Sequence, residues 1–332
     1  MARIIISKTN QIGDVVFALP MSTAIKQTWP DSHIIFLGRG YTSALIEHYQ
    51  DVDETADWDA ISNLPDDRAI EALKALRADT IIHVHPNKRL AYLARRAGIK
   101  ARIGTIGRFY HWLTCNRFVR VSRKNSPLHE TQLDMQYLKA LGLKSDYSLA
   151  EIIALRRFKP FKLTSKIKKL LDPKKFNLIL HPKTRGEHIE WPLSDYAALI
   201  AALPQDQFHI LVTGSVVEGD KIREQVLTPF SHVTDLCGKL SLEELQILIA
   251  HADGLIASST GPVHLAAAFG IHTLGLYAPI KPFDAGRWGP VGKKAQVLSV
   301  EKNCDWCRDL RPCRCVGEIS VEQVKSVVMG WL

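Results

Sequence analysis

The sequence of 332 residues has no apolar run long enough to cross a membrane as a helix. Such a helix needs about 18 or more consecutive, mostly apolar residues. The N-terminal stretch MARIIISKTNQIGDVVF has one Arg before a short apolar run that Lys8 interrupts, and it contains no small-residue cleavage site. This pattern predicts a first β-strand rather than a signal peptide, so we expect the protein to stay in the cytoplasm.

Acidic residues are also in short supply. The chain has 34 Asp and Glu residues against 43 Lys and Arg, which gives a formal net charge of +9. A basic balance favours an anionic partner such as nucleic acid, phospholipid headgroups or a phosphorylated substrate, and a generally basic soluble protein is the alternative. The basic residues lack the aromatic interleaving of single-strand binding platforms, so we expect no nucleic-acid partner.

Cysteines are few, and four of the six lie within CDWCRDLRPCRC. Structural disulfides are rare in cytosolic proteins. Cys304 and Cys307 have the spacing of a zinc knuckle, but Cys313 and Cys315 are closer together than the common zinc pattern requires. A structural zinc ion and reduced or partly bridged thiols both remain open, and we expect no catalytic role for this cluster.

What the chain does have is a regular alternation of short apolar segments with helical ones. The first half contains the apolar segments RIIIS, HIIFLG and TIIHVH, separated by helical patterns such as AIEALKALRA. After a basic stretch the alternation restarts with NLILHP, FHILVTG, DGLIASS and HTLGLYAP. This pattern predicts the α/β class, with two doubly wound parallel sheets in tandem. In such sheets ligands bind outside the carboxyl ends of the strands.

The segment SSTGPVHLAAAFG joins one of these strands to a helix. The hydroxyls of Ser259 and Thr260 and the amide of Gly261 precede Pro262, which suits the first helical position. The positive end of a helix attracts anions, so this turn predicts a phosphate site that His264 also reaches. An ordinary helix cap and a structural histidine are the alternatives.

Two further strand-ending loops carry polar residues. HPKTRG offers Lys183, Thr184 and Arg185 to an anion, and GSVVEGD offers Glu218 to the hydroxyls of a ribose. Each loop alone is also compatible with an ordinary polar turn.

Asp14 follows the first strand, directly after Gly13. At the start of a helix an aspartate often serves as a cap. At the mouth of the first βα turn it also suits a general base that removes a proton from a substrate. Both interpretations stay open on the local sequence.

A basic cluster lies on the helix predicted within HVHPNKRLAYLARRAG, which carries Lys88, Arg89, Arg95 and Arg96. A solvated helix face is one interpretation. The other is a docking site for an acceptor that bears phosphates.

Taken together, KTNQIGDVVFALP, HPKTRGEHIEWP, GSVVEGD, GKLSLEELQILIAHAD and SSTGPVHLAAAFG occur in an order and spacing that resemble glycosyltransferase family 9, the ADP-heptose:lipopolysaccharide heptosyltransferases. The resemblance covers nearly the whole chain. It implies a GT-B fold, with two Rossmann-like domains and the active site in the cleft between them. The expected divisions are an acceptor-binding domain at 1–155, a linker at 156–175, a nucleotide-sugar-binding domain at 176–317, and a helix at 318–332 that returns towards the first domain.

The resemblance also implies a reaction: inverting transfer of heptose from ADP-heptose to the phosphorylated lipopolysaccharide inner core, either Kdo-lipid A or heptosylated core, without a metal or cofactor. By position, Asp14 matches the catalytic base, Glu218 the ribose ligand, and Leu240 the adenine site. The positions that match the diphosphate site are Lys183, Thr184, Ser259, Thr260, Gly261 and His264. We expect the enzyme to contact the cytoplasmic face of the inner membrane peripherally.

Two departures from the family pattern stand out. The family commonly reads Asp-Thr-Gly where this chain has Ser259, Thr260 and Gly261, so a carboxylate that would contact heptose hydroxyls is missing. The family often has a lysine shortly before Trp191, and here Lys183 or Arg185 is left to supply that charge. A nucleotide-sugar isomerase on the same fold and a non-catalytic sugar-nucleotide binder are the alternative functions.

Overall fold

The computed structural model describes residues 2–123, 126–184, 189–281, 284–300 and 315–332. The chain divides into two compact units, residues 1–160 and 161–332, which we treat separately. Each unit contains a six-stranded, fully parallel sheet. The predicted α/β class is therefore confirmed.

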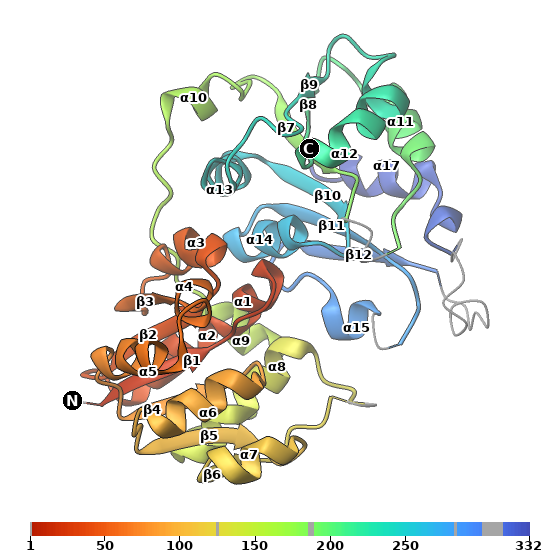
Figure 1. Ribbon diagram of the computed structural model, residues 1–332. Coiled ribbons are helices and arrows are strands. Elements are labelled where there is room, and N and C mark those ends of the chain that lie inside the picture. Colours follow the sequence, from red (N-terminus) through yellow and green to blue (C-terminus); the bar gives the residue numbers. More distant parts are fainter. Residues whose placement is uncertain (1, 124–125, 185–188, 282–283, 301–314) are drawn as a thin grey trace. The chain divides into compact units, whose positions relative to one another are not determined.

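The first unit has helices on both faces of its sheet (Figure 1). Its sheet order is β3-β2-β1-β4-β5-β6. The strands are β1 (Arg3–Ser7), β2 (His33–Gly38), β3 (Glu54–Asp57), β4 (Thr80–His83), β5 (Ala101–Thr105) and β6 (Arg117–Val119). The helices are α1 (Ile12–Ala18), α2 (Pro20–Thr28), α3 (Ser43–Glu47), α4 (Trp58–Ser62), α5 (Asp66–Ala75), α6 (Lys88–Arg96), α7 (Phe109–Thr114), α8 (Glu130–Met135) and α9 (Leu149–Leu155).

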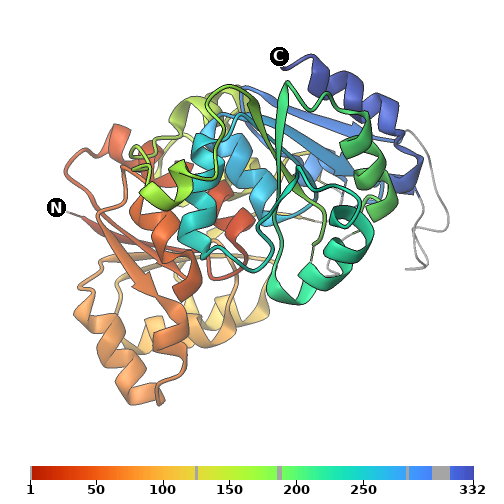
Figure 2. The ribbon, with the colours of Figure 1, turned by 90° about the horizontal axis from the view of Figure 1, so that it is seen from above.

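The second unit repeats this plan, and its layering is visible from above (Figure 2). Its sheet order is β12-β11-β10-β7-β8-β9. The strands are β7 (Phe176–His181), β8 (Phe208–Val212), β9 (Thr234–Asp235), β10 (Gly254–Ser258), β11 (His272–Tyr277) and β12 (Ala295–Ser299). The helices are α10 (Ser165–Lys168), α11 (Leu193–Ala202), α12 (Val216–Ile222), α13 (Leu242–His251), α14 (Gly261–Phe269), α15 (Ala285–Trp288) and α17 (Val321–Met329).

The central strands have apolar middle segments because both faces of each sheet are covered. Ile4, Ile5 and Ile6 of β1 are all buried, although successive side chains of a strand point to opposite faces. An unbroken apolar run is typical of a parallel strand between two helical layers. Apolar runs of this kind allow such strands to be predicted from the sequence.

The direction of strand addition reverses once in each sheet. In the first unit β1 pairs with β2 on one side and with β4 on the other. In the second unit β7 pairs with β8 and with β10. At such a switch point the loops after the two central strands diverge and leave a crevice, which is where ligands of doubly wound sheets bind.

The chain between and after the sheets is divided as follows. The predicted linker, 156–175, falls partly in each unit, and its short surface helix is α10. The C-terminal helix α17 packs against α11 of the second unit, with Val324 and Val328 in that unit's core. The predicted domain limits themselves remain a prediction.

Candidate active site

A buried lysine lies at the switch point of the first unit. Lys8 follows β1, and its side chain is 2% exposed. Its Nζ lies 2.7 Å from an oxygen of Asp134, 3.7 Å from one of Asp14 and 3.9 Å from one of Glu130. A buried ammonium needs such carboxylates, because burial without them disfavours the charged form. Their charges hold the pKa of Lys8 above its ordinary value despite that burial.

Arg123 supplies a second cation to the same group. Its Nε lies 2.6 Å from Glu130 and its Nη2 3.1 Å from Asp134. We call Lys8, Asp14, Arg123, Glu130 and Asp134 the carboxylate cluster. Three carboxylates face two cations in it, so with every group ionised the cluster carries one negative charge in excess.

Asp14 is the most exposed of the three carboxylates in the cluster. Its side chain is 13% exposed, against 3% for Glu130 and none for Asp134. Burial is the largest influence on Asp14 and raises its pKa above the ordinary value; Lys8 opposes this shift and Glu130 adds to it. A proton that neutralises the excess charge is therefore most readily exchanged with the outside at Asp14.

The helix-cap interpretation of Asp14 is wrong. Helix α1 begins at Ile12 with Gln11 as its N-cap, so Asp14 is the third helical residue. The capping position precedes the first helical residue, and a carboxylate further along instead interacts with the helix dipole. The side chain of Asp14 faces Lys8 rather than closing the helix end.

His85 adds a neutral neighbour that sequence reasoning missed. It follows β4, the other strand of the switch point, and its amide donates to the carbonyl of Ser7 at 3.1 Å. Burial, aided by the nearby charges of Lys8 and Arg123, lowers the pKa of His85 to about 4. The imidazole is therefore uncharged near neutral pH. A histidine directly after an apolar strand was the signal that would have identified it.

The switch point of the second unit has a different composition. Lys183 and Thr184 follow β7, and Lys183 Nζ contacts Glu190. Glu190 also accepts hydrogen bonds from the Thr184 amide at 2.7 Å and from its hydroxyl at 3.0 Å. The charge of Lys183 is therefore paired with a neighbouring carboxylate. Arg185, the other candidate cation of this loop, lies outside the described residues.

The neighbouring strand β10 leads directly into α14. The N-cap Thr260 is extended, and within the described structure its side chain makes no capping hydrogen bond. Gly261 opens the helix, while Ser259 and His264 are 8% and 5% exposed. Because β10 pairs with β7, this turn and the Lys183 loop lie at adjacent carboxyl ends of the sheet. The structure thus brings the predicted diphosphate residues together at the switch point.

Glu218 and Leu240 follow the next two strands outward, β8 and β9. Glu218 belongs to a capping box at the start of α12, in which one of its oxygens accepts from the Ser215 amide at 2.8 Å and from its hydroxyl at 2.6 Å. Val216 and Val217 at the same helix start are 71% and 88% exposed. The sequence analysis did not single out these two apolar residues.

The four residues of the predicted acceptor cluster on α6 differ in their contacts. Arg89 bonds to Asp66 and to loop carbonyls, Arg96 bonds to Asp66 and Asp67, and Arg95 bonds to the Leu113 carbonyl. Lys88, at the first position of α6, has no such partner among the described residues. Because α6 follows β4, its first residue lies towards the edge of the sheet that carries Asp14. Arg95 and Arg96 are about 12 Å further along the helix axis.

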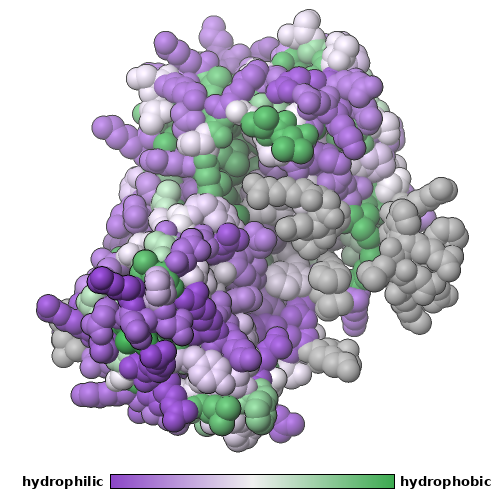
Figure 3. Space-filling view, viewed as in Figure 1, coloured by the Kyte–Doolittle hydropathy of each residue, from purple (hydrophilic) through white to green (hydrophobic). Residues whose placement is uncertain are grey.

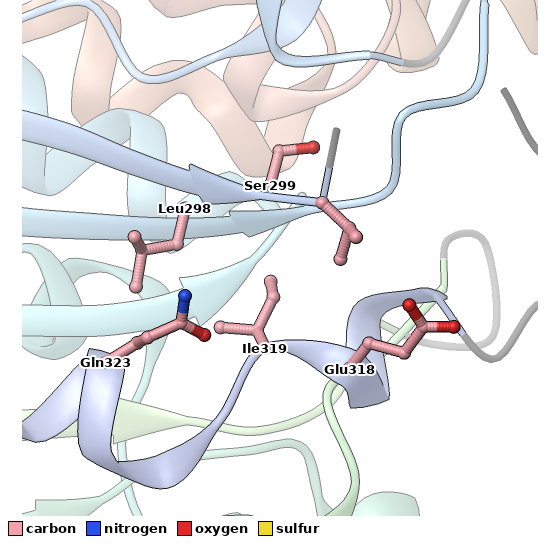
Figure 4. A pocket seen from close by; sticks show the side chains of 6 residues that line it. Leu298, Ser299, Glu318, Ile319 and Gln323 are labelled. Carbon is pink, nitrogen blue, oxygen red and sulfur yellow. The ribbon is translucent and has the colours of Figure 1, made fainter. Parts of the chain in front are cut away.

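A surface hollow of about 170 Å³ lies elsewhere in the second unit, between the end of β12 and the start of α17 (Figure 4). Its lining residues are Leu298, Ser299, Val300, Glu318, Ile319 and Gln323. None of the predicted site residues is among them, so the hollow gives no support to any predicted role.

The structure can be searched for metal sites and membrane-spanning helices only over the described residues. Over the described ranges no three His, Cys, Asp or Glu side chains are arranged to hold a metal ion. Cys304, Cys307 and Cys313 lie outside those ranges, and Cys315 is buried. Within the same ranges no helix is long and apolar enough to cross a membrane.

The chain is similar to known proteins over most of its length. Residues 67–314, most of the chain, match the model of glycosyltransferase family 9 (heptosyltransferase). The chain is 22% identical to the lipopolysaccharide core heptosyltransferase OpsX of Haemophilus influenzae over 343 residues, which cover 96% of this chain and 94% of that one.

Solved structures agree in fold. E. coli ADP-heptose lipopolysaccharide heptosyltransferase II superposes with a TM-score of 0.77 at 17% identity, covering 100% of this chain and 98% of the other. E. coli heptosyltransferase WaaC, solved with ADP, gives 0.75 at 19% identity, covering 99% and 100%. The chain therefore has the GT-B fold of these enzymes and belongs to glycosyltransferase family 9, the heptosyltransferase family.

Proposed function

We propose that this protein transfers heptose from ADP-heptose to the inner core of lipopolysaccharide, with inversion at the sugar carbon. The observation that carries the proposal is the pair of switch points. One presents Asp14 above a buried cluster with excess negative charge, and the other presents an uncapped helix start beside Lys183. A glycosyl transfer needs these two functions: proton removal from the acceptor and stabilisation of the leaving diphosphate.

The donor is proposed to lie along the carboxyl edge of the second sheet. The diphosphate would meet the Gly261 amide, the Thr260 hydroxyl and Lys183, where β10 and β7 adjoin. The ribose would lie beside Glu218 after β8, and the adenine beside Leu240 after β9, with Val216 as further apolar surface. The strand order β10-β7-β8-β9 matches the order diphosphate, ribose, base. That WaaC was solved with ADP supports this type of donor.

The mechanism follows from where charge develops. The acceptor hydroxyl loses its proton as it attacks the sugar carbon, and Asp14 accepts that proton. Protonation of Asp14 removes the excess charge of the cluster, so Lys8 and Arg123 are then matched by Glu130 and Asp134. The diphosphate gains negative charge as the sugar bond breaks, and the start of α14 with Lys183 stabilises that charge in the transition state. The proposed reaction uses the sugar nucleotide as its donor substrate and includes no cofactor.

The acceptor is proposed to be a phosphorylated lipid, either Kdo-lipid A or a heptosylated core, bound by the first unit. Lys88 is the best-placed member of the predicted cluster, because it lies towards the edge that carries Asp14 and has no recorded ion pair in the described structure. Peripheral contact with the inner membrane would bring the enzyme to such an acceptor.

One assay tests the function directly. Incubating the protein with ADP-heptose and deep-rough lipopolysaccharide is expected to release ADP and to add the mass of one heptose to the acceptor. Turnover of ADP-heptose without acceptor would instead favour an isomerase or epimerase. Tight ADP-heptose binding with no turnover on any heptose-deficient acceptor would favour a sugar-nucleotide binder. ADP-glucose and ADP-ribose serve as controls for the sugar, because Ser259 replaces the family's carboxylate.

A further inference from the structure

Helix α7 has its polarity reversed. Phe109, Trp112 and Leu113 are 80%, 58% and 48% exposed, whereas His111 and Thr114 on the other side are buried. The spacing of the three apolar residues places them on one face of the helix. A surface helix ordinarily buries such a face in the core. Here the core receives the polar face, so the apolar face is left for something outside the unit.

The apolar surface continues onto β6, the edge strand. The rings of Trp112 and Phe118 stack with their centroids 5.2 Å apart, and Ile106 and Phe118 are each 37% exposed. The indole Nε1 of Trp112 donates to the Ile106 carbonyl at 3.1 Å. Because its one donor is already satisfied, the indole ring leaves water at little cost. We call Ile106, Phe109, Trp112, Leu113 and Phe118 the α7 patch.

Figure 3 shows apolar side chains gathered over α7 and β6 at the lower end of the first unit. Isolated exposed apolar residues are normal on a protein surface, but a contiguous group rimmed by polar residues marks an interaction site.

The charge around the patch is of one sign. Residues 80–129 contain eleven Lys and Arg and no Asp or Glu. Three of the eleven, Arg89, Arg96 and Arg123, pair with carboxylates from outside this segment. Arg108 precedes α7, Arg117 and Arg120 flank the exposed Phe118, and Arg95 contacts the Leu113 carbonyl. The expectation that basic residues lack aromatic neighbours is therefore wrong for this segment.

We propose that the α7 patch docks the protein on an anionic phospholipid surface. Phe109 and Leu113 would enter the boundary between headgroups and acyl chains, Trp112 would lie at the headgroup level, and the arginines would pair with lipid phosphates. A second copy of the chain fits less well, because joining two such faces would bring two sets of arginines together with no local carboxylate to offset them. This inference does not depend on the chemistry proposed for Asp14.

Flotation with lipid vesicles tests the proposal. The protein is expected to float with vesicles of phosphatidylcholine and phosphatidylglycerol, less with phosphatidylcholine alone, and less as salt is added. Replacing Phe109 and Leu113 together by Ser is expected to lower the partition coefficient at least about tenfold. Replacing Arg108 and Arg120 by Gln is expected to lower it roughly fivefold per charge on anionic vesicles only.

Two controls separate docking from other effects. Leu332→Ser removes an apolar side chain that is 60% exposed in the other unit and is expected to leave flotation unchanged. Lipids brominated in their acyl chains are expected to quench tryptophan fluorescence of the wild type, and Trp112→Phe is expected to lose most of that quenching while still floating. Transfer to a delipidated, phosphorylated core oligosaccharide is expected to be unaffected by the Phe109/Leu113 change, so failure of docking and failure of heptosyl transfer are distinguishable.

Three results would overturn the proposal. The first is that the Phe109/Leu113 variant floats with vesicles as well as the wild type does. The second is that vesicles bind no protein while the wild type self-associates and this variant does not, and the third is that the patch binds single-stranded RNA more tightly than anionic vesicles at the same salt.

Discussion

The two units build their sheets in one strand order and then line the switch points with different chemistry. From one edge of the sheet to the other, the first unit has the order β3-β2-β1-β4-β5-β6. The second unit has the equivalent order β9-β8-β7-β10-β11-β12. The first switch point holds five ionisable side chains paired with one another in the interior. The second holds hydroxyls, a helix start and one lysine–glutamate pair. Topology thus supplies the location of a site, and the loops decide its chemistry.

From this difference we infer that the carboxylate cluster of the first unit takes up a proton and that the start of α14 in the second unit binds a phosphate. A buried cluster with excess negative charge responds to a single proton, because desolvation makes that charge costly. A partly exposed helix start offers fixed dipoles to a large anion and does not need to titrate. Four predictions test this division, and we give them in order of expected effect.

The largest effect is expected for Asp14→Asn, which removes the proton acceptor and keeps the shape of the side chain. We expect the rate to fall roughly 10²–10⁴-fold. Because Asp14 is not the N-cap, Tm and ADP affinity are expected to change little. Wild-type kcat/KM is also expected to fall at low pH as Asp14 is protonated, and burial places that limb above the ordinary carboxyl range. A folded variant with near-native turnover and the same low-pH limb would move the base elsewhere.

The second effect is expected for Gly261→Val, which crowds the start of α14 where the diphosphate approaches the backbone. ADP affinity is expected to fall at least about tenfold, the worth of one hydrogen bond to a charged group. Ser320→Ala is the matched control, because it removes the cap of another helix in the same unit away from the switch point. It is expected to lower Tm and leave calorimetric ADP affinity unchanged. Equal ADP affinity in all three proteins would remove the start of α14 from the donor site.

Much of this arrangement is readable from the sequence, and what is not has identifiable causes. Strands such as β1 and β10 are unbroken apolar runs and were predicted. The edge strand β6 has only three residues, and β12 is partly exposed along its whole length, so neither shows that signal. Helix α7 was missed because its apolar residues face outward and its helical segment is short.

The polar side chains divide in the same way. Asp14, Lys183 and Gly261 follow strands and were found by that position. Lys8 was passed over because lysine is ordinarily exposed, and its partner Asp134 lies 126 residues away. No local pattern reports a contact of that range, so the charge balance around Asp14 required the structure.

The third prediction concerns the neighbours of Asp14 and separates an electrostatic role from a merely structural one. Lys8→Met removes a charge that lowers the pKa of Asp14, so the low-pH limb of kcat/KM is expected to move to higher pH. Glu130→Gln removes a charge that raises it, so the limb is expected to move to lower pH. Lys8→Met is expected to lose stability, because it leaves three carboxylates against one cation. Glu130→Gln leaves two carboxylates against two cations and loses the charged contact with Arg123, so its loss of stability is expected to be smaller.

Opposite shifts are the informative result here. A structural role alone would lower activity at every pH and leave the limb in place. Glu71→Gln, which breaks an exposed ion pair with Lys74, is the control and is expected to move neither the limb nor Tm appreciably. If Lys8→Met does not fold, the shift of Glu130→Gln alone still decides the question. Shifts of the same sign would contradict the charge balance described for the cluster.

The smallest effect is expected on the acceptor side of the first unit, where the contacts divide the predicted cluster. Lys88→Ala is expected to raise KM for a phosphorylated acceptor roughly fivefold, the worth of one exposed charge contact, and to leave KM for the dephosphorylated acceptor unchanged. Arg96→Ala is expected to change neither KM, because its guanidinium already pairs with Asp66 and Asp67. ADP affinity is expected to be the same in both variants, since the donor is assigned to the other unit.

Equal increases in KM for Lys88→Ala and Arg96→Ala would instead support the four-residue acceptor site predicted from the sequence. Arg96 would then have to exchange its contacts with Asp66 and Asp67 for contacts with acceptor phosphates. If KM rose equally for the phosphorylated and the dephosphorylated acceptor, α6 would have no part in recognising acceptor phosphates. Its arginines would then have only the packing role that their contacts show.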